Sequence, residues 1–177
     1  MFIKTGYCQK HLSIHSRALT SLPPEIGQLR QLKTLQLTFA TGLTNLPPEI
    51  GQLSQLQTLE LTTTQLTRLP PEIGQLEKLE RLNLSESLAL TSLPLELGHL
   101  TNLQTFYLSV FKDFVFPPSD IIAQSTPAIL AYLRDYETML MRQTLAGIAA
   151  GVGGIAGVML LFRWRQRRGL HEKKKRA

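Results

Sequence analysis

This chain has a single cysteine and lacks the common catalytic motifs. Cys8 is its only cysteine among 177 residues, so no internal disulfide can form. Cysteine usage therefore does not indicate whether the protein resides in an oxidising or a reducing compartment. The sequence contains no nucleophile elbow, phosphate-binding loop or His-Glu zinc pattern. His11 and His15 share one face of a predicted strand, but no third metal ligand accompanies them. We therefore expect no enzymatic activity, no metal site and no cofactor.

Net positive charge is confined to the carboxyl-terminal tail. The formal net charge is +6, but residues 163–177 carry eight basic side chains against Glu172 alone, a net of +7. Residues 1–162 have a net charge of −1. A nucleic-acid-binding surface needs basic charge on the folded domain. The sequence therefore argues against a nucleic-acid partner.

Four near-copies of one stretch dominate what is present. They begin at Leu19 (LTSLPPEIGQLRQLKTLQL), Leu43 (LTNLPPEIGQLSQLQTLEL), Leu66 (LTRLPPEIGQLEKLERLNL) and Leu90 (LTSLPLELGHLTNLQTFYL). Apolar pairs with strand periodicity, in which alternate residues point to opposite faces, recur every 23 or 24 residues. These pairs are Leu12/Ile14, Leu35/Leu37, Leu59/Leu61, Leu82/Leu84 and Phe106/Leu108. A fixed period of this length indicates a repeat architecture.

Each repeat contains proline and glycine at fixed positions, where they limit helix length and allow the chain to turn. The prolines remove amide donors and exclude a long helix; they are Pro23/Pro24, Pro47/Pro48, Pro70/Pro71 and Pro94. The glycine that follows in each copy allows the chain to bend back. One unit cannot bury its own leucines, so stability requires about three or more stacked units. The five predicted strands meet that requirement.

These motifs resemble the leucine-rich repeat family, in the LPPEIG subtype found in Ras-pathway scaffolds and many bacterial repeat proteins. The resemblance covers residues 10–122, about five repeats, after a stub at residues 1–9. It implies an α/β fold, a curved solenoid with a parallel sheet on its concave face, and a role in protein binding.

One family position departs from the expected pattern. The family places a buried Asn three residues after the second strand leucine, where it bonds to neighbouring loop backbone. This sequence has Arg17, Ala40, Thr64, Ser87 and Phe111 there. Thr and Ser can replace part of such a ladder, but Ala and Phe cannot. We therefore expect looser turns on the convex side.

The repeats are predicted to end in a capping helix at residues 123–142. Residues 114–121 keep the repeat spacing, with Pro117 at the place of a leucine. Thr126-Pro127 is typical of a helix start. The apolar residues that follow have helical spacing; they are Ile129, Leu130, Leu133, Tyr136 and Leu140.

Residues 143–162 form a charge-free run of twenty residues. A helix of that length is about 30 Å long, the thickness of a bilayer's hydrocarbon core, so we expect a single transmembrane helix rather than an Ala/Gly-rich linker. Gly147/Gly151 and Gly153/Gly157 match the spacing of membrane helix dimers, which predicts a possible homodimer. The basic tail at 163–177 is expected to contact anionic lipid.

The tail's charge favours a cytoplasmic C-terminus, with the repeats outside the cytoplasm. The N-terminus shows no continuous apolar region or cleavage pattern of a signal peptide. Only nine residues precede the first strand, too few to cover Leu12, Ile14 and Leu19. We expect that an amino-terminal segment is missing; contact of these residues with another chain is the alternative. The opposite topology, a tail-anchored protein with cytoplasmic repeats, stays open.

Alternation along the strands selects the candidate binding residues on the concave face. The central column is Ser13, Gln36, Glu60, Asn83 and Tyr107, and Thr58, Arg81 and Thr105 lie beside it. Aromatic and Arg side chains dominate binding hot spots, so Tyr107 and Arg81 are the expected anchors. We assign partner binding to Gln36, Thr58, Glu60, Arg81, Asn83, Thr105 and Tyr107.

The sequence thus predicts a membrane-anchored repeat protein that recognises a protein or peptide ligand. One alternative is a fragment of a larger repeat receptor or scaffold that acts in assembly. Another is a cytoplasmic scaffold tethered by its tail. The sequence does not identify the ligand.

Overall fold

The computed structural model describes residues 10–109 and 114–149, with side chains as far as Thr144. The chain divides into two compact units, residues 1–134 and 135–177. The repeats belong to the first unit. In the second, the described residues are the remainder of one helix.

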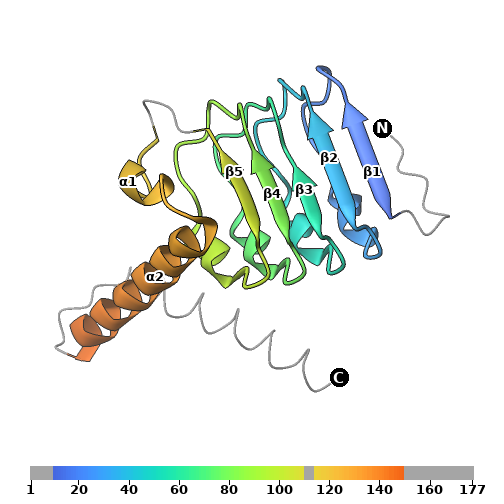
Figure 1. The fold of residues 1–177 in the computed structure, drawn as a ribbon. Coiled ribbons are helices and arrows are strands. Elements are labelled where there is room, and N and C mark those ends of the chain that lie inside the picture. The colour runs from blue at the N-terminus through green and yellow to red at the C-terminus, as the bar shows by residue number, and fades with distance from the viewer. Residues whose placement is uncertain (1–9, 110–113, 150–177) are drawn as a thin grey trace, which may run out of the picture. The chain divides into compact units, whose positions relative to one another are not determined.

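A parallel sheet forms the front layer of the first unit (Figure 1). Its order follows the sequence, with each strand pairing only with its sequence neighbours. The strands are β1 (His11–His15), β2 (Thr34–Thr38), β3 (Thr58–Glu60), β4 (Arg81–Leu84) and β5 (Thr105–Leu108). Equivalent residues of successive repeats pair in register, as the spacing of the apolar pairs predicted.

Short 3-10 helices form the layer behind the sheet. They are η1 (Pro24–Gln28), η2 (Pro48–Gln52), η3 (Pro71–Gln75) and η4 (Leu95–His99), and consecutive ones contact each other. Proline occupies the first position of η1 to η3. It fits a helix start because a backbone N–H at that position would have no acceptor within the helix, so its absence costs no hydrogen bond. Each helix stops after five residues, where a leucine N–H bonds back to the Ile or Leu carbonyl three residues earlier.

The leucines of strands, turns and 3-10 helices pack into one continuous core between the two layers. Both leucines of β2 are fully buried, whereas Leu12 and Ile14 of the edge strand β1 are only partly buried. This gradient follows from the stacking, since an inner repeat is covered on two sides and each repeat depends on its neighbours for burial.

Consecutive 3-10 helices lie too close together for a side chain between them. A Cβ added to Gly74 would lie 2.3 Å from the backbone oxygen of Glu96. One added to Gly51 would lie 2.6 Å from the backbone oxygen of Glu72. The repeated glycine therefore sets the stacking distance behind the sheet, in addition to allowing the bend.

Buried hydroxyls occupy two of the positions where the family places asparagine. Thr64 and Ser87 are buried, their hydroxyl oxygens are 2.8 Å apart, and the Ser87 hydroxyl donates to the Leu61 carbonyl at 2.8 Å. Ala40 is fully buried and Arg17 is exposed, while Phe111 lies outside the described residues. Thr and Ser thus replace part of the ladder, as expected from their chemistry.

The turns that follow the strands share an unusual backbone conformation and are hydrogen-bonded to one another. Phe39, Thr63 and Glu86, each one residue before the ladder position, adopt φ between 56° and 58°. The backbone N–H of Phe39 donates to Thr62 at 3.1 Å, and that of Thr63 to Ser85 at 3.1 Å. Backbone hydrogen bonds between neighbouring turns therefore supply cohesion that the sequence alone did not reveal.

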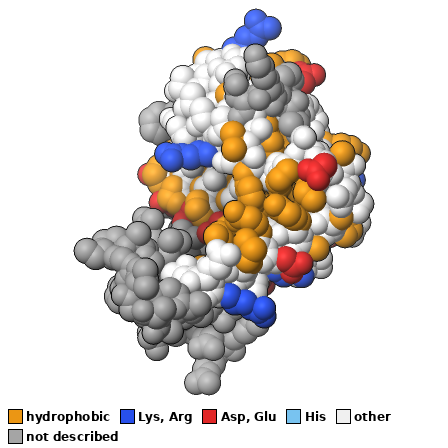
Figure 2. Space-filling view, turned by 90° about the vertical axis from the view of Figure 1, so that its left-hand side faces the viewer, with side chains coloured by type: hydrophobic (Ala, Val, Ile, Leu, Met, Phe, Trp, Pro, Cys, Tyr) orange, Lys and Arg blue, Asp and Glu red, His pale blue; other side chains and the backbone are white. Residues whose placement is uncertain are grey.

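The last repeat closes with two helices. Pro117 is buried at the expected leucine position, and the short helix α1 (Ser119–Ile122) follows at the sequence position where the other repeats have a 3-10 helix. The Val115 N–H donates to the Thr91 carbonyl, and the Leu93 N–H donates to the Phe116 carbonyl. These backbone hydrogen bonds attach the last repeat to the one before it. Figure 2 views the molecule from the side where α1 lies in Figure 1, and hydrophobic side chains gather there. Val115, at 76%, is the most exposed large hydrophobic residue described.

The predicted capping helix forms the first part of α2 (Thr126–Ala149), which continues without a break into residues 143–149, the start of the predicted membrane segment. The Ser125 carbonyl accepts the Ile129 N–H at 3.1 Å, which places the cap at Ser125, one residue before the predicted Thr126. Ile129, Leu130 and Leu133 are buried, as the helical spacing predicted.

Arg134 and Gly98 join α2 to the last 3-10 helix. The Arg134 side chain donates to the Gly98 carbonyl through Nε at 3.2 Å and Nη2 at 3.0 Å. A Cβ at Gly98 would lie 2.9 Å from the Arg134 backbone nitrogen. In the final repeat α2 thus fills the place that the next 3-10 helix takes in the others.

No helix among the described residues is long and apolar enough to cross a membrane. The predicted membrane segment 143–162 lies mainly outside these residues, and so does the basic tail 163–177.

Replacing Gly74 by alanine should lower the free energy of unfolding by about 1–3 kcal/mol, because the nearest atom is backbone and cannot rotate away. Chemical denaturation of the full chain measures this change. Ser54→Ala, at an exposed loop position, is the control and should be close to neutral. Equal stability of Gly74→Ala and the wild type would contradict the proposed stacking constraint.

Ser87→Ala should cost about 1–3 kcal/mol, since the Thr64 hydroxyl and the Leu61 carbonyl would lose a buried partner. Adding Thr64→Val removes the second hydroxyl, so the double variant should lose less than the sum of the single losses. Strict additivity in a double-mutant cycle would show that the two hydroxyls are not coupled.

Candidate functional site

The face of the sheet that points away from the 3-10 helices is the candidate site, and we call it the open face. It corresponds to the predicted concave face. The register aligns Gln36 with Glu60, Glu60 with Asn83, and Asn83 with Tyr107. Thr58, Arg81 and Thr105 form a second aligned row. All seven predicted binding residues therefore lie on this face; their role in binding is not tested by their position.

Hydrogen bonds between side chains fix part of the central column. Gln36 Nε2 donates to Glu60 Oε2 at 2.8 Å, so the carboxylate has a neutral donor rather than a cation. Asn83 Oδ1 accepts the Ser85 backbone N–H at 3.0 Å. These contacts hold Gln36, Glu60 and Asn83 in defined orientations. They form an ordered polar floor.

Tyr107 and Arg81 are the two exposed residues among the seven. Tyr107 is 54% exposed, and Arg81 is also exposed, whereas Thr58, Glu60, Asn83 and Thr105 are half-buried. An exposed tyrosine offers a large rigid apolar surface and a hydroxyl at little entropic cost. The two residues predicted as anchors are thus the two most available to a partner.

The edge strand β1 carries a separate hydrogen-bonded group. The His15 Nε2 and the Ser13 hydroxyl are 2.8 Å apart, and His15 Nδ1 is hydrogen-bonded to the Thr38 hydroxyl. Both ring nitrogens therefore have partners. No group of three or more His, Cys, Asp or Glu able to hold a metal occurs among the described residues. His15 is ordered within a polar network on this edge.

Sequence reasoning missed Phe39, which lies directly after β2 at the rim of the open face. Its side chain is 54% exposed although its φ of 57° is unusual for a bulky residue. Thr63 and Glu86 hold the equivalent rim positions, and the Thr63 hydroxyl donates to Glu86 Oε2 at 2.9 Å. Comparison of the repeats position by position would have found Phe39 as the only aromatic residue at this position, where the other repeats have Ser16, Thr63, Glu86 and Val110.

The open face is suited to a macromolecular partner. Strands about 4.8 Å apart make it roughly 20 Å wide across five strands. It combines hydroxyl groups, one ordered carboxylate, one arginine and two exposed aromatic residues. Such a broad surface with a few anchors is typical of protein and peptide recognition.

Of the four glycines predicted to associate membrane helices, one lies among the residues that the structure describes. Gly147 lies in α2. Gly151, Gly153 and Gly157 lie outside the described residues.

Comparison with known sequences identifies a family for most of the repeat region. A family described as "Leucine-rich repeat region" matches residues 24–116, more than half of the chain. No curated protein sequence matches the chain.

Solved leucine-rich repeat structures are similar to part of the chain. A repeat protein of Leptospira interrogans is 28% identical, with a TM-score of 0.35, over 59% of this chain and 40% of its own. The ectodomain of the receptor kinase SOBIR1 from Arabidopsis thaliana is 27% identical, with a TM-score of 0.43, over 59% and 65%. The plant peptide hormone receptor RGFR1, solved with RGF2, is 27% identical, with a TM-score of 0.38, over 55% and 20%. The chain thus spans less than two thirds of the length of each of these proteins.

Proposed function

Because this chain belongs to the leucine-rich repeat family, we propose that it binds a protein or peptide through the open face of its sheet. The family is typically a non-enzymatic interaction fold, and we assign no catalytic role to the chain. The observation that carries the proposal is the exposure of Tyr107 and Arg81 above an ordered polar floor.

The distribution of apolar side chains supports this proposal. Strand leucines of the inner repeats point into the core and are fully buried, whereas Tyr107 on the opposite face is 54% exposed. Tyr107 faces Asn83 across the strand pair, and Arg81 faces Thr105. A partner that covered Tyr107 would bury apolar area at about 25 cal/mol per Å². A carboxylate on the partner would be a suitable acceptor for Arg81.

Photo-crosslinking in the native host tests this proposal. A benzoylphenylalanine at position 107 should yield a specific crosslinked protein or peptide, whereas one at Gln31, an exposed loop residue outside the sheet, should not. Arg81→Ala in the position-107 variant should weaken the crosslink several-fold. The same products from both positions, or none from position 107, would exclude the open face as the binding surface.

We also propose that the carboxyl-terminal segment anchors the chain in a membrane as a single span, with the C-terminus cytoplasmic. Support comes from the sequence: residues 143–162 carry no charge, and eight basic residues follow them directly. The basic tail would then lie against anionic lipid, and the paired glycines would favour a homodimer. A fragment of a larger receptor, acting in assembly, is the alternative for the same segments.

Alkaline carbonate extraction of host membranes tests the anchor. The full chain should stay in the membrane pellet, and a chain ending at residue 142 should be released. Val152→Asp, at the centre of the charge-free run, should lower insertion because a central Asp costs about 2.5–3.5 kcal/mol; Gln143→Asp, at its edge, serves as the control. Protease protection of terminal tags then gives the orientation. Release of the full chain by carbonate would refute the anchor.

A further inference from the structure

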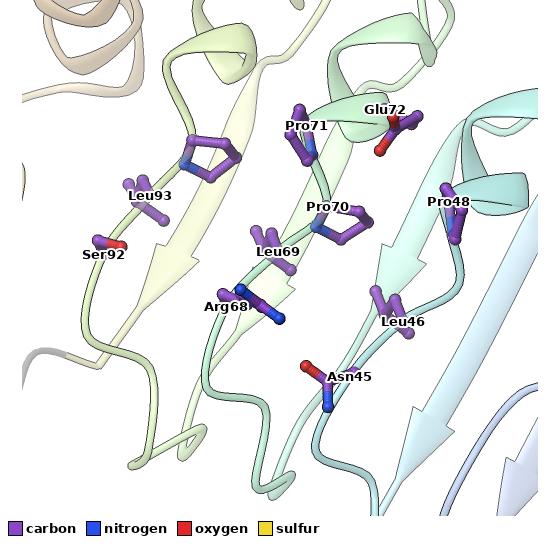
Figure 3. A pocket seen from close by; sticks show the side chains of 11 residues that line it. Asn45, Leu46, Pro48, Arg68, Leu69, Pro70, Pro71, Glu72, Ser92 and Leu93 are labelled. Carbon is purple, nitrogen blue, oxygen red and sulfur yellow. The ribbon is translucent and has the colours of Figure 1, made fainter. Parts of the chain in front are cut away.

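A groove lies away from the open face, where the stretches leading into η2, η3 and η4 run side by side (Figure 3). Its volume is about 490 Å³, within the range of ligand sites. Backbone hydrogen bonds hold its walls together, from Thr67 N–H to the Thr44 carbonyl at 3.1 Å and from Thr91 N–H to the Thr67 carbonyl at 3.4 Å. No strand residue lines it. The groove is therefore distinct from the site proposed above.

Three equivalent leucines form the floor of the groove. Leu46, Leu69 and Leu93 contribute small exposed fractions of 7%, 4% and 3%, and they belong to the core behind them. One side of the groove is made of proline rings, including Pro70 and Pro94. Proline rings and core leucines have few accessible rotamers, so the apolar surface is already ordered before anything binds.

The opposite side is polar and carries one cation. Asn45, Arg68 and Ser92 stand at the same position of three successive repeats, immediately before the floor leucines. Figure 3 shows these side chains on one side of the floor, away from Pro71 and Glu72. Asn45 and Ser92 have short, uncharged side chains. Among these three equivalent positions, only Arg68 has a long, charged side chain.

Arg68 is not required by the fold in any visible way. Its side chain is exposed, and no hydrogen bond or ion pair joins its guanidinium to another described residue. The neighbouring repeats stack equally well with Asn or Ser at this position. An arginine beside an apolar floor, with its donors unused, offers a fork-shaped site for a carboxylate.

We propose that this groove binds an extended peptide segment that places an Asp or Glu on Arg68 and apolar side chains on the leucine floor. A basic segment would be repelled by Arg68, and a wholly apolar one would cover the guanidinium without giving it a partner, which is costly. Glu72 at the proline side disfavours a second carboxylate there. Three repeats are about 10 Å across, which corresponds to three or four extended residues.

The test begins with a library of random heptapeptides displayed on phage and selected on the full-length protein. Sequences that also bind the Arg68→Ser protein are removed. The enriched peptides should carry one acidic residue next to apolar ones. Fluorescence anisotropy of a synthetic, labelled peptide should then show at least about tenfold weaker binding to Arg68→Ser. Replacing the peptide's acidic residue by its amide should give a similar loss.

Matched variants distinguish binding in the groove from binding elsewhere on the chain. Arg30→Ser removes one positive charge from an exposed loop outside the groove and should leave binding unchanged. Tyr107→Ala alters the open face and should also have no effect, so failure of the proposed function and failure of the groove are distinguishable. Arg68→Lys keeps the charge but loses the fork, and should bind with intermediate affinity.

Three outcomes would overturn the proposal: no enrichment at all, enriched peptides without Asp or Glu, or equal binding to the wild type and Arg68→Ser. A thermal melt of Arg68→Ser should match that of the wild type, because the side chain makes no hydrogen bond or ion pair with another described residue. A lower melting temperature would assign Arg68 to stability, and the peptide-side substitution would then decide the matter.

Discussion

The close approach of successive repeats behind the sheet is the constraint on which the rest of this structure depends. Each repeat exposes leucines that only the next repeat can cover, so the spacing between repeats decides whether the core is dry. The glycines of the 3-10 helices set that spacing, because a Cβ on Gly51 or Gly74 would lie only 2.6 Å or 2.3 Å from a backbone oxygen of the next helix. Register in the sheet and contact between turns follow from the same spacing. At the last repeat, α2 meets Gly98 in the same manner.

Cohesion between the turns is achieved by different means from one repeat to the next. Thr64 and Ser87 form a buried hydroxyl relay, whereas the buried Ala40 offers no polar group. Backbone hydrogen bonds at Phe39 and Thr63 connect the turns to their neighbours. The stack thus tolerates loss of the family's asparagine, because most of its cohesion comes from leucine burial and backbone pairing that do not depend on that side chain.

Most of the fold could be predicted from the sequence because the repeat makes each local signal appear several times. Strand positions, the parallel register and the buried Pro117 followed from spacing alone. The positive φ at Phe39 did not, since it accompanies a backbone hydrogen bond to the neighbouring turn. The positions of the open-face residues followed from alternation, but their exposure did not. Alternation gives the face of a side chain and says nothing of its neighbours' size.

Residues that depart from the repeat pattern help to distinguish side chains that bind a partner from those that stabilise the fold. Residues shared by all copies are explained by stacking, so they carry little information about a partner. Phe39, Arg68 and Tyr107 differ from the residues at the same positions of the other repeats, and all three side chains are exposed. Phe39 keeps an aromatic ring in water on an unfavourable backbone conformation. Exposed residues that do not stabilise the fold are the ones most reasonably assigned to binding. Here Phe39 and Tyr107 lie at the open face, and Arg68 lies at the groove.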